Sequence, residues 1–432
     1  MRLPLDSTAP PSSPPSADRL RRMALEAGAD DAGLVELARP ALDEQRADLL
    51  RHFPWAKSLL ALVVRMNREP LRSTARSIAN LEFHTSGQAV DEVARRIVRA
   101  LEERGVRAVN PAMGFPMEMQ HFPGKLWTVA HKPVAVAAGL GRMGIHRSVI
   151  HPRFGSFVLL GTIVLGVDVD EPGQPIDFDP CVSCKLCVAA CPVGAIAADG
   201  EFDFSACYTH NYREFMGGYT DYMDEVADAR DRHELRRRVD DAESASWWQS
   251  LSHGANYKAA YCLGVCPAGS EVMAPFEQDR AGFVEDVVRP LQDKAETLYV
   301  LEGSDAQRYA AQRYPHKPTK SVGNSLRPSS VRGFLQGMPL VFQRGAAAGL
   351  DATYHFRFTG REECEATVRI RDQKLRVESG LAGEPDLLIT ADAASWIAFL
   401  RKERGLLPAL LTRRVRLKGS PRLLLAFGRC FP

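Results

Sequence analysis

Long apolar runs alternate with helical patterns over the first 170 residues. Ser58–Arg65 is almost wholly apolar, the pattern of a strand buried on both faces of a sheet, and Phe157–Val167 repeats it. Shorter strands are predicted at Ala32–Val35 and from Val106. Between them, apolar residues recur at helical spacing at Val90, Val93, Ile97 and Leu101. This alternation predicts an α/β domain over 18–170.

The last hundred residues follow a different pattern. Tyr354, Phe356 and Phe358 alternate with His355 and Arg357, as in a strand with one buried face. Further alternating segments occur at 366–370, 375–377, 387–389 and 415–419, and helical patterns at 396–411 and 421–427. We expect an α+β domain over 333–432, with an antiparallel sheet, helices on one face and an apolar interior. It offers no set of nucleophile, base and orienting residue, so its predicted role is to bind an apolar ligand or to pack and dimerise.

The remaining segments carry weaker patterns. Residues 1–17 are rich in Pro and Ser and are predicted to be a disordered lead. Residues 276–332 are expected to be a linker with a helix over 285–298. An insert at 208–258 has a charged middle, Asp221–Asp241, predicted as a solvated helix, with aromatic residues at both ends. These aromatics either line a pocket or pack a loop against the core.

Composition narrows the class of protein. The 432 residues are 45% hydrophobic and 25% charged, as in ordinary soluble proteins, and the net charge of +2 gives no argument for a nucleic-acid surface. Nine cysteines are too few for a disulfide scaffold at this length, which indicates a reducing compartment. No apolar run is long enough to span a bilayer and no secretory signal is recognisable, so a cytoplasmic protein without a transmembrane segment is expected.

The chemistry centres on the run from Cys181 to Pro192. Its spacing, C-x2-C-x2-C-x3-C-P, is that of bacterial ferredoxins, in which three thiolates hold one cluster and the fourth ligates another. A zinc site or buried free thiols are the alternatives. An iron–sulfur cluster is the prediction, and residues 171–275 form the predicted ferredoxin-type domain.

Later cysteines suggest a second cluster. Cys266 precedes a proline, as Cys191 does, and two-cluster ferredoxins exchange their last cysteines. The predicted ligands of the first [4Fe-4S] cluster are Cys181, Cys184, Cys187 and Cys266, and those of the second are Cys191, Cys207 and Cys262. The pattern places Ala259 where an eighth cysteine belongs. The second cluster is therefore three-iron, has an open iron, or takes a non-cysteine ligand such as His210 or His253. The alternative is that only one cluster forms.

A glycine block precedes the cysteines. Gly139, Gly141 and Gly144 form G-x-G-x-x-G, but the residues before them look helical, whereas a dinucleotide site requires a strand there. We interpret the block as a backbone turn that another large group approaches closely, since glycine has no Cβ.

These features together resemble the epoxyqueuosine reductase and reductive dehalogenase group over about residues 18–275. The shared features are the glycine block, the Pro-x-Phe-Gly-Ser turn at 152–156, and the cysteine run followed by a lone cysteine and a distal cysteine–proline pair. The resemblance implies two [4Fe-4S] clusters that pass single electrons to a corrinoid in the N-terminal domain. Gly139, Gly141 and Gly144 would then lie against the corrinoid.

The sequence departs from that group at its proton donor. An aspartate is expected about a dozen residues before the glycine block, where Lys125 and His131 stand, and His146 replaces the usual lysine after it. Lys125, His131 and His146 are therefore the candidate proton donors. The alternative for each is a solvated or internally hydrogen-bonded side chain.

Residues 335–430 resemble the sterol carrier protein 2 type of lipid-binding domain. The resemblance lies in the strand ending at Gly360, the segment Val368–Asp372, the strand Pro385–Thr390, Trp396 and Arg416–Gly419. It implies a hydrophobic tunnel for a sterol, an acyl chain or a similar molecule.

The combined expectation is an iron–sulfur oxidoreductase that acts on an apolar substrate, and its dependence on a corrinoid is left open. Its electron donor would be a ferredoxin or flavodoxin, and a nucleic-acid partner is suggested only by family analogy. Two alternatives stay open: a non-catalytic electron carrier with a lipid-binding or docking module, and a redox sensor based on the under-ligated second cluster.

Overall fold

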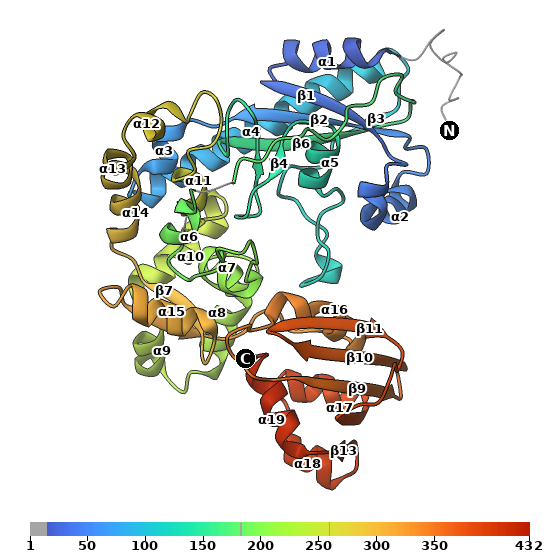
Figure 1. Ribbon diagram of the computed structural model, residues 1–432, viewed down its shortest axis with the longest axis vertical. Helices are drawn as coiled ribbons and strands as arrows, with labels where there is room; N and C mark the ends of the chain where they lie inside the picture. Colours follow the sequence, from blue (N-terminus) through green and yellow to red (C-terminus); the bar gives the residue numbers. More distant parts are fainter. Residues whose placement is uncertain (1–14, 182–183, 259) are drawn as a thin grey trace.

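The computed structural model describes residues 15–181, 184–258 and 260–432. Three parts follow one another along the chain: an N-terminal domain, a cysteine-rich region and a C-terminal domain (Figure 1). Most of the predicted N-terminal lead lies outside the described residues, and helix α1 begins at Ala17, with the Ser16 side chain as its N-cap. Among the described helices, none has the length and apolar content required to cross a membrane.

The N-terminal domain is built on a four-stranded sheet in the order β1-β2-β6-β3, in which all neighbours are antiparallel. Its strands are β1 (Asp31–Glu36), β2 (Ser58–Arg65), β3 (Ala108–Val109) and β6 (Val158–Leu165). The two long apolar runs form the central strands β2 and β6, which are almost entirely buried, as predicted. A small hairpin, β4 (Arg142–Met143) with β5 (Val149–Ile150), lies beside the sheet.

Helices cover both faces of this sheet, which explains the two-sided burial of the central strands. Helices α1 (Ala17–Glu26) and α4 (Arg76–Glu102) pack on one face, and η1 (Pro40–Leu42), α2 (Asp43–His52) and α5 (His131–Ala137) on the other. Helix α4 starts well before the predicted apolar stripe. Its first turns contact the insert instead of the sheet, where Asn80 donates to the carbonyl of Tyr257 at 2.9 Å.

The cysteine-rich region is mainly helical. Its helices are α6 (Leu186–Ala190), α7 (Phe204–Asn211), α8 (Gly217–Asp228), α9 (Arg232–Arg238), α10 (Asp241–His253), α11 (Tyr261–Gly264), α12 (Ala274–Gln278), α13 (Arg280–Phe283), η3 (Val284–Val288) and α14 (Arg289–Asp293). Helix α3 (Arg68–Arg72), from the N-terminal part of the chain, packs against α11. The single solvated helix predicted over 221–241 is wrong, because the chain turns between α8 and α9, where Asp231 caps the new helix. The helix predicted over 285–298 ends at Asp293, since Leu298 begins a strand.

The stretch expected as a linker contains more structure than one helix. Strands β7 (Leu298–Leu301) and β8 (Thr319–Val322) pair in parallel, and α15 (Asp305–Arg313) connects them. Leu298, Val300 and Ala310 belong to the same core as Cys187 and Cys191. These elements therefore support the cysteine loop, while the boundaries of the domains stay predictions.

The C-terminal domain holds a five-stranded sheet in the order β11-β10-β9-β12-β13. Its elements are α16 (Val331–Val341), β9 (Ala352–Thr359), β10 (Cys364–Arg371), β11 (Lys374–Ser379), β12 (Leu387–Asp392), α17 (Ala393–Leu400), α18 (Leu406–Leu411), β13 (Val415–Gly419) and α19 (Pro421–Arg429). The predicted strands are confirmed, but the sheet is not wholly antiparallel. Strand β12 pairs in parallel with β9, because the chain passes from β11 to the far side of β9 before it re-enters the sheet.

Candidate metal centre

The four thiols predicted for the first cluster lie round one pocket. Cys181, Cys184, Cys187 and Cys266 line it, together with Ile145, His146, Ile150, Pro180 and Lys185. Burial raises the pKa of Cys187, and the nearby thiolates of Cys262 and Cys266 raise it further. Binding of iron requires these thiols to lose their protons.

A tight backbone contact positions Cys266. Gly155 has a φ of +65°, and a Cβ at this position would clash with the carbonyl oxygen of Ala268. The amide of Ser270 donates to Pro152 at 2.9 Å, and the Ser156 hydroxyl donates to Leu263 at 3.1 Å. The Pro-x-Phe-Gly-Ser turn therefore seats the distal cysteine against the first three.

The other three thiols form a second group. Cys191 follows α6, Cys207 lies on α7 and Cys262 on α11. Burial raises the pKa of Cys262 to about 12, and the Cys191 thiolate adds to the shift. The amide of Ala195 donates to the Cys191 sulfur at 3.3 Å, a contact that would stabilise a thiolate.

Lys132 on α5 is a cation beside the second group that sequence reasoning missed. Its charge opposes the raised pKa of both Cys207 and Cys262, and its ammonium donates to the Arg147 carbonyl at 2.6 Å. No local pattern marks it, because Lys132 is 75 residues from Cys207 and 130 residues from Cys262 in the sequence. A positive charge here would favour the reduced, more negative state of a cluster.

The donor set fits iron–sulfur clusters. Within residues 15–181, 184–258 and 260–432, no three His, Cys, Asp or Glu side chains converge as ligands of a single metal ion would. Thiolates spread round a pocket suit a cluster instead, since each iron takes one of them. Position 259, where the pattern lacks a cysteine, lies outside the described residues.

His146 lines the pocket of the first group and has a buried ring nitrogen without a partner in the described protein. Its side chain is buried, and Nδ1 accepts from the Ser148 amide at 3.1 Å. Burial lowers the pKa of His146 to about 4, so the ring is neutral and carries its single proton on Nε2. Nε2 has no partner in the described protein although it is buried, and His146 lines the pocket of four thiols.

The other two proton-donor candidates have partners of their own. His131 is buried between α5 and β6, with Nδ1 2.9 Å from the Thr162 hydroxyl and Nε2 3.1 Å from the Ala112 carbonyl. Lys125 forms an ion pair with Asp48 at 2.7 Å on a partly exposed surface. Neither contact involves a cysteine thiol.

The glycine block is covered by the chain itself. A Cβ on Gly139 would crowd the carbonyl of Gln174, one on Gly141 that of Ile150, and one on Gly144 the side chains of Ile150 and His146. Close packing against backbone at Gly139 and Gly141, and against side chains at Gly144, therefore accounts for the three glycines. That a corrinoid lies against these glycines stays a prediction of the resemblance.

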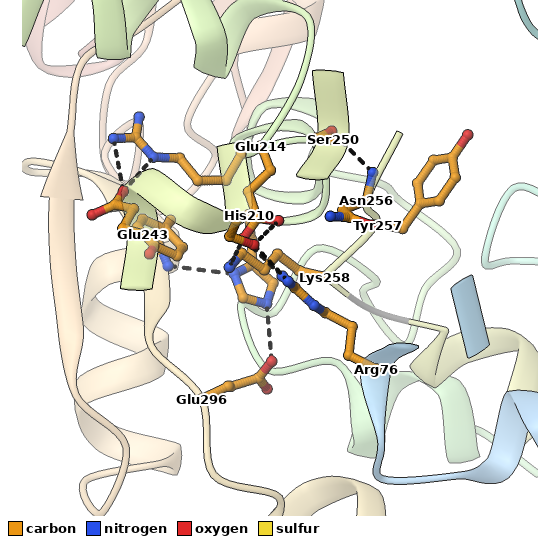
Figure 2. A network of polar contacts seen from close by, with 12 residues as sticks. Arg76, His210, Glu214, Glu243, Ser250, Asn256, Tyr257, Lys258 and Glu296 are labelled. Atoms are coloured by element: carbon orange, nitrogen blue, oxygen red, sulfur yellow. Dashed lines mark hydrogen bonds and ion pairs between the residues drawn. The ribbon is translucent and has the colours of Figure 1, made fainter. Parts of the chain in front are cut away.

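A buried charge network joins α4, the insert and Glu296 (Figure 2). Arg76 of α4 contacts Glu214 of the insert at 2.7 Å, and Lys258 pairs with the same carboxylate. Burial alone would raise the pKa of Glu214, but these two cations outweigh it and lower that pKa. This network fixes the insert against α4.

In the described protein, the two histidines proposed as non-cysteine ligands contact other groups and not the cysteine thiols. His210 stands one turn after Cys207 and is directed into the network, where its Nε2 lies 3.8 Å from Glu296 and its Nδ1 accepts from the Tyr299 amide at 3.3 Å. His253 is exposed at the end of α10, with its ring against Trp248.

Two family models match the chain. Residues 175–197 match the 4Fe-4S binding domain and residues 342–432 match the SCP-2 sterol transfer family. The chain thus carries an iron–sulfur binding segment and a C-terminal sterol-carrier module, as the two resemblances implied.

Curated relatives cover part of the chain. The chain is 24% identical over 262 residues to the epoxyqueuosine reductase of Vibrio cholerae, which covers 59% of this chain and 62% of that protein. It is 39% identical over 79 residues to the epoxyqueuosine reductase of Bacillus anthracis, 18% of this chain and 20% of that one. The chain thus spans less than two thirds of these relatives.

Solved structures with a similar trace include two groups. The N-terminally tagged catabolic reductive dehalogenase NpRdhA is 16% identical, with a TM-score of 0.39 over 64% of this chain and 35% of that one. An epoxyqueuosine reductase crystallised with a modified tRNA stem loop is 19% identical, with a TM-score of 0.33 over 44% of this chain and 56% of that one.

Proposed function

We propose that the protein is an iron–sulfur oxidoreductase that passes electrons through two clusters to a small acceptor. The observation that supports it best is the separation of seven thiols into two adjoining groups, one of four and one of three. Cys187 and Cys262, one from each group, are close enough for their charges to interact. Two clusters at that separation would exchange electrons directly.

In this proposal the first group holds a complete [4Fe-4S] cluster and the second keeps one iron without a cysteine ligand. Clusters store and deliver single electrons, and two of them supply the pair that a two-electron reduction needs. The Nε2–H of His146 would donate a hydrogen bond to a sulfur of the first cluster. Lys132 would place a positive charge beside the second.

The C-terminal module would bind the apolar substrate or a lipid. Trp396 is 1% exposed within the aromatic core, and its indole N–H has no acceptor in the described protein. A buried donor without a partner is costly, and a ligand oxygen inside the domain would satisfy it. This points to an apolar molecule with one hydroxyl or carbonyl group.

The electron donor in this proposal is a ferredoxin or flavodoxin of a reducing compartment such as the cytoplasm, where free thiols persist. The corrinoid is a prediction of the resemblance alone, and no step of the proposal depends on it.

The test is anaerobic reconstitution with iron, sulfide and hydroxocobalamin, followed by desalting, stepwise reduction and EPR. We expect two interacting cluster signals and reoxidation of the reduced protein by an apolar acceptor under turnover. Iron for a single cluster would contradict the two-cluster proposal. Full reduction without turnover of any acceptor, but with a change of shape on oxidation, would support the sensor. Cobalamin retained in stoichiometric amount would bring the corrinoid into the reaction.

A further inference from the structure

The net charge of the chain hides a strong asymmetry. Residues 401–432 contain nine Arg and Lys but one acidic residue, Glu403, which gives this segment a charge of +8. Since the whole chain carries +2, residues 1–400 carry −6. All nine cations are exposed, and in this fully described segment only Arg401 forms an ion pair, with Glu403 at 3.9 Å.

Exposed leucines lie among these cations. Leu407 and Leu411 of α18 are 74% and 84% exposed, and they are four residues apart, so they lie on one face of the helix. Their neighbours Leu406 and Leu410 pack against the domain core instead. On α19, Leu425 is 68% exposed and stands between Arg422 and Arg429, at spacings of three and four residues. Helix α19 therefore presents leucine and arginine together to the outside, and the exposed Arg413 and Arg414 follow directly after the leucines of α18.

These elements form one end of the molecule. Helices α18 and α19 and strand β13 gather at the end of the C-terminal domain that lies farthest from the N-terminal domain (Figure 1). The far end of α19 is fixed, because the Cys430 carbonyl accepts from Gln343 at 2.9 Å and that of Pro432 from Asn324 at 3.0 Å. A partner could cover this end without blocking the cysteine-rich region.

We propose that this basic, leucine-bearing end, residues 401–429, docks on the surface of an anionic membrane. Cationic side chains are attracted to anionic headgroups, and leucines gain free energy when they enter the boundary between headgroups and acyl chains. A nucleic acid would use the charge but not the leucines, since phosphates offer no apolar surface. A second copy of this chain would be repelled, because the same segment carries a charge of +8 in each copy. Docking would place the sterol-carrier module where apolar molecules are stored.

The test is flotation of the full-length protein with vesicles of phosphatidylcholine alone or mixed equally with phosphatidylglycerol. We expect binding to the mixed vesicles, weakened by salt, and little to the neutral ones. Changing Leu407→Ser together with Leu411→Ser should reduce binding at least about tenfold. Changing Arg413→Gln together with Arg414→Gln should reduce it by about fivefold per charge.

Matched control variants distinguish an effect of residues 401–429 from a general loss of exposed leucines or positive charges. The pair Leu81→Ser and Leu251→Ser removes leucines that are 65% and 63% exposed elsewhere, and Arg236→Gln with Arg237→Gln removes two exposed charges from α9. Both pairs should bind vesicles normally, and circular dichroism should show that all variants melt like the parent.

Two results would overturn the proposal. The first is vesicle binding that the leucine pair does not reduce, which would make it non-specific attraction of charge. The second is absence of vesicle binding together with tight binding of an RNA hairpin, measured by fluorescence anisotropy, which would assign this surface to nucleic acid.

Discussion

The interiors of the cysteine-rich region and the C-terminal domain differ in the side chains that they bury. The C-terminal core is aromatic, with Tyr354, Phe356, Phe358, Trp396 and Phe427 in mutual contact. Such side chains bury large apolar areas and pack closely without a cofactor. We therefore expect contacts among its own side chains to fold the domain without a cofactor.

The core of the cysteine-rich region mixes thiols with apolar side chains, since Cys187 and Cys191 lie among residues such as Tyr261, Phe283 and Leu298. It also buries charge: Arg213 is 2% exposed and pairs with Glu243 at 3.3 Å. A buried ion pair is weak support for stability, because desolvation offsets the attraction. Because its loops carry the thiols that metal would hold, we expect the cysteine-rich region to depend on its metal and the C-terminal domain not to.

Removal of iron should have the largest effect. An anaerobic chelator is expected to abolish amide protection over 184–207 and 261–268, because binding of metal by these thiols is coupled to folding of the loops that carry them. Protection over the strands at 352–371 should be unchanged. Hydrogen exchange with mass spectrometry measures both. Equal loss in the two regions would show that the C-terminal domain also depends on the clusters.

Two buried cysteines provide the next test. Cys266→Ser removes a predicted ligand and should lower the bound iron by about half, since one of two clusters is lost. Cys430→Ser alters a thiol that is 0% exposed in the C-terminal core and should leave the iron unchanged. Iron analysis with EPR measures this. Full iron in the Cys266 variant would contradict the assignment of ligands.

The reverse test removes an aromatic side chain. Phe356→Ala should destabilise the C-terminal domain by about 3–5 kcal/mol through loss of burial and the cavity left behind, without change in bound iron. Trp396, which stacks edge-to-face on Phe356, reports the unfolding by fluorescence in denaturant. Leu425→Ala, at an exposed position, should change stability by less than about 0.5 kcal/mol. Iron lost together with the fold would show that the regions unfold as one.

His146 tests a finer feature of the cysteine-rich region. His146→Leu removes the Nε2–H donor, so the reduced first cluster loses a hydrogen bond and its midpoint potential should fall. His146→Gln retains an N–H in a similar place and should keep the potential close to that of the parent. Redox titration by EPR measures the shift, and the coupling of an exchangeable deuteron to the cluster should disappear only in the leucine variant. Equal potentials in all three proteins would remove His146 from the cluster's surroundings.

The same contrast explains what could be predicted from the sequence. Ligand spacing is a local chemical constraint, so the division of the thiols, including the assignment of Cys266 to the first group, followed from the chain alone. The alternating aromatics of β9 likewise identified their buried face. Both patterns are contained within a few consecutive residues.

Long-range partners left no such pattern. The parallel pairing of β12 with β9 depends on where a connection crosses the sheet, and the role of His131 depends on Ala112 and Thr162, 19 and 31 residues away. The basic end of the C-terminal domain was missed because a net charge of +2 sums two opposite segments.

Lys125 gives the smallest expected effect. It pairs with Asp48 at 2.7 Å, but its side chain is 41% exposed, so Lys125→Ala should cost only about 0.2–1 kcal/mol in urea unfolding. The hydrogen bond from Lys125 lowers the pKa of the Asp48 carboxyl, so this stability is present at neutral pH and is lost as the pH falls below about 4, where the carboxyl protonates. The difference between variant and parent should therefore vanish in acid. Iron content and midpoint potentials should be unchanged, because a surface pair contributes nothing to the thiol groups. A rate of substrate reduction that fell with Lys125→Ala, while stability and potentials held, would instead restore Lys125 as the proton donor and place the reaction at this side of the N-terminal domain.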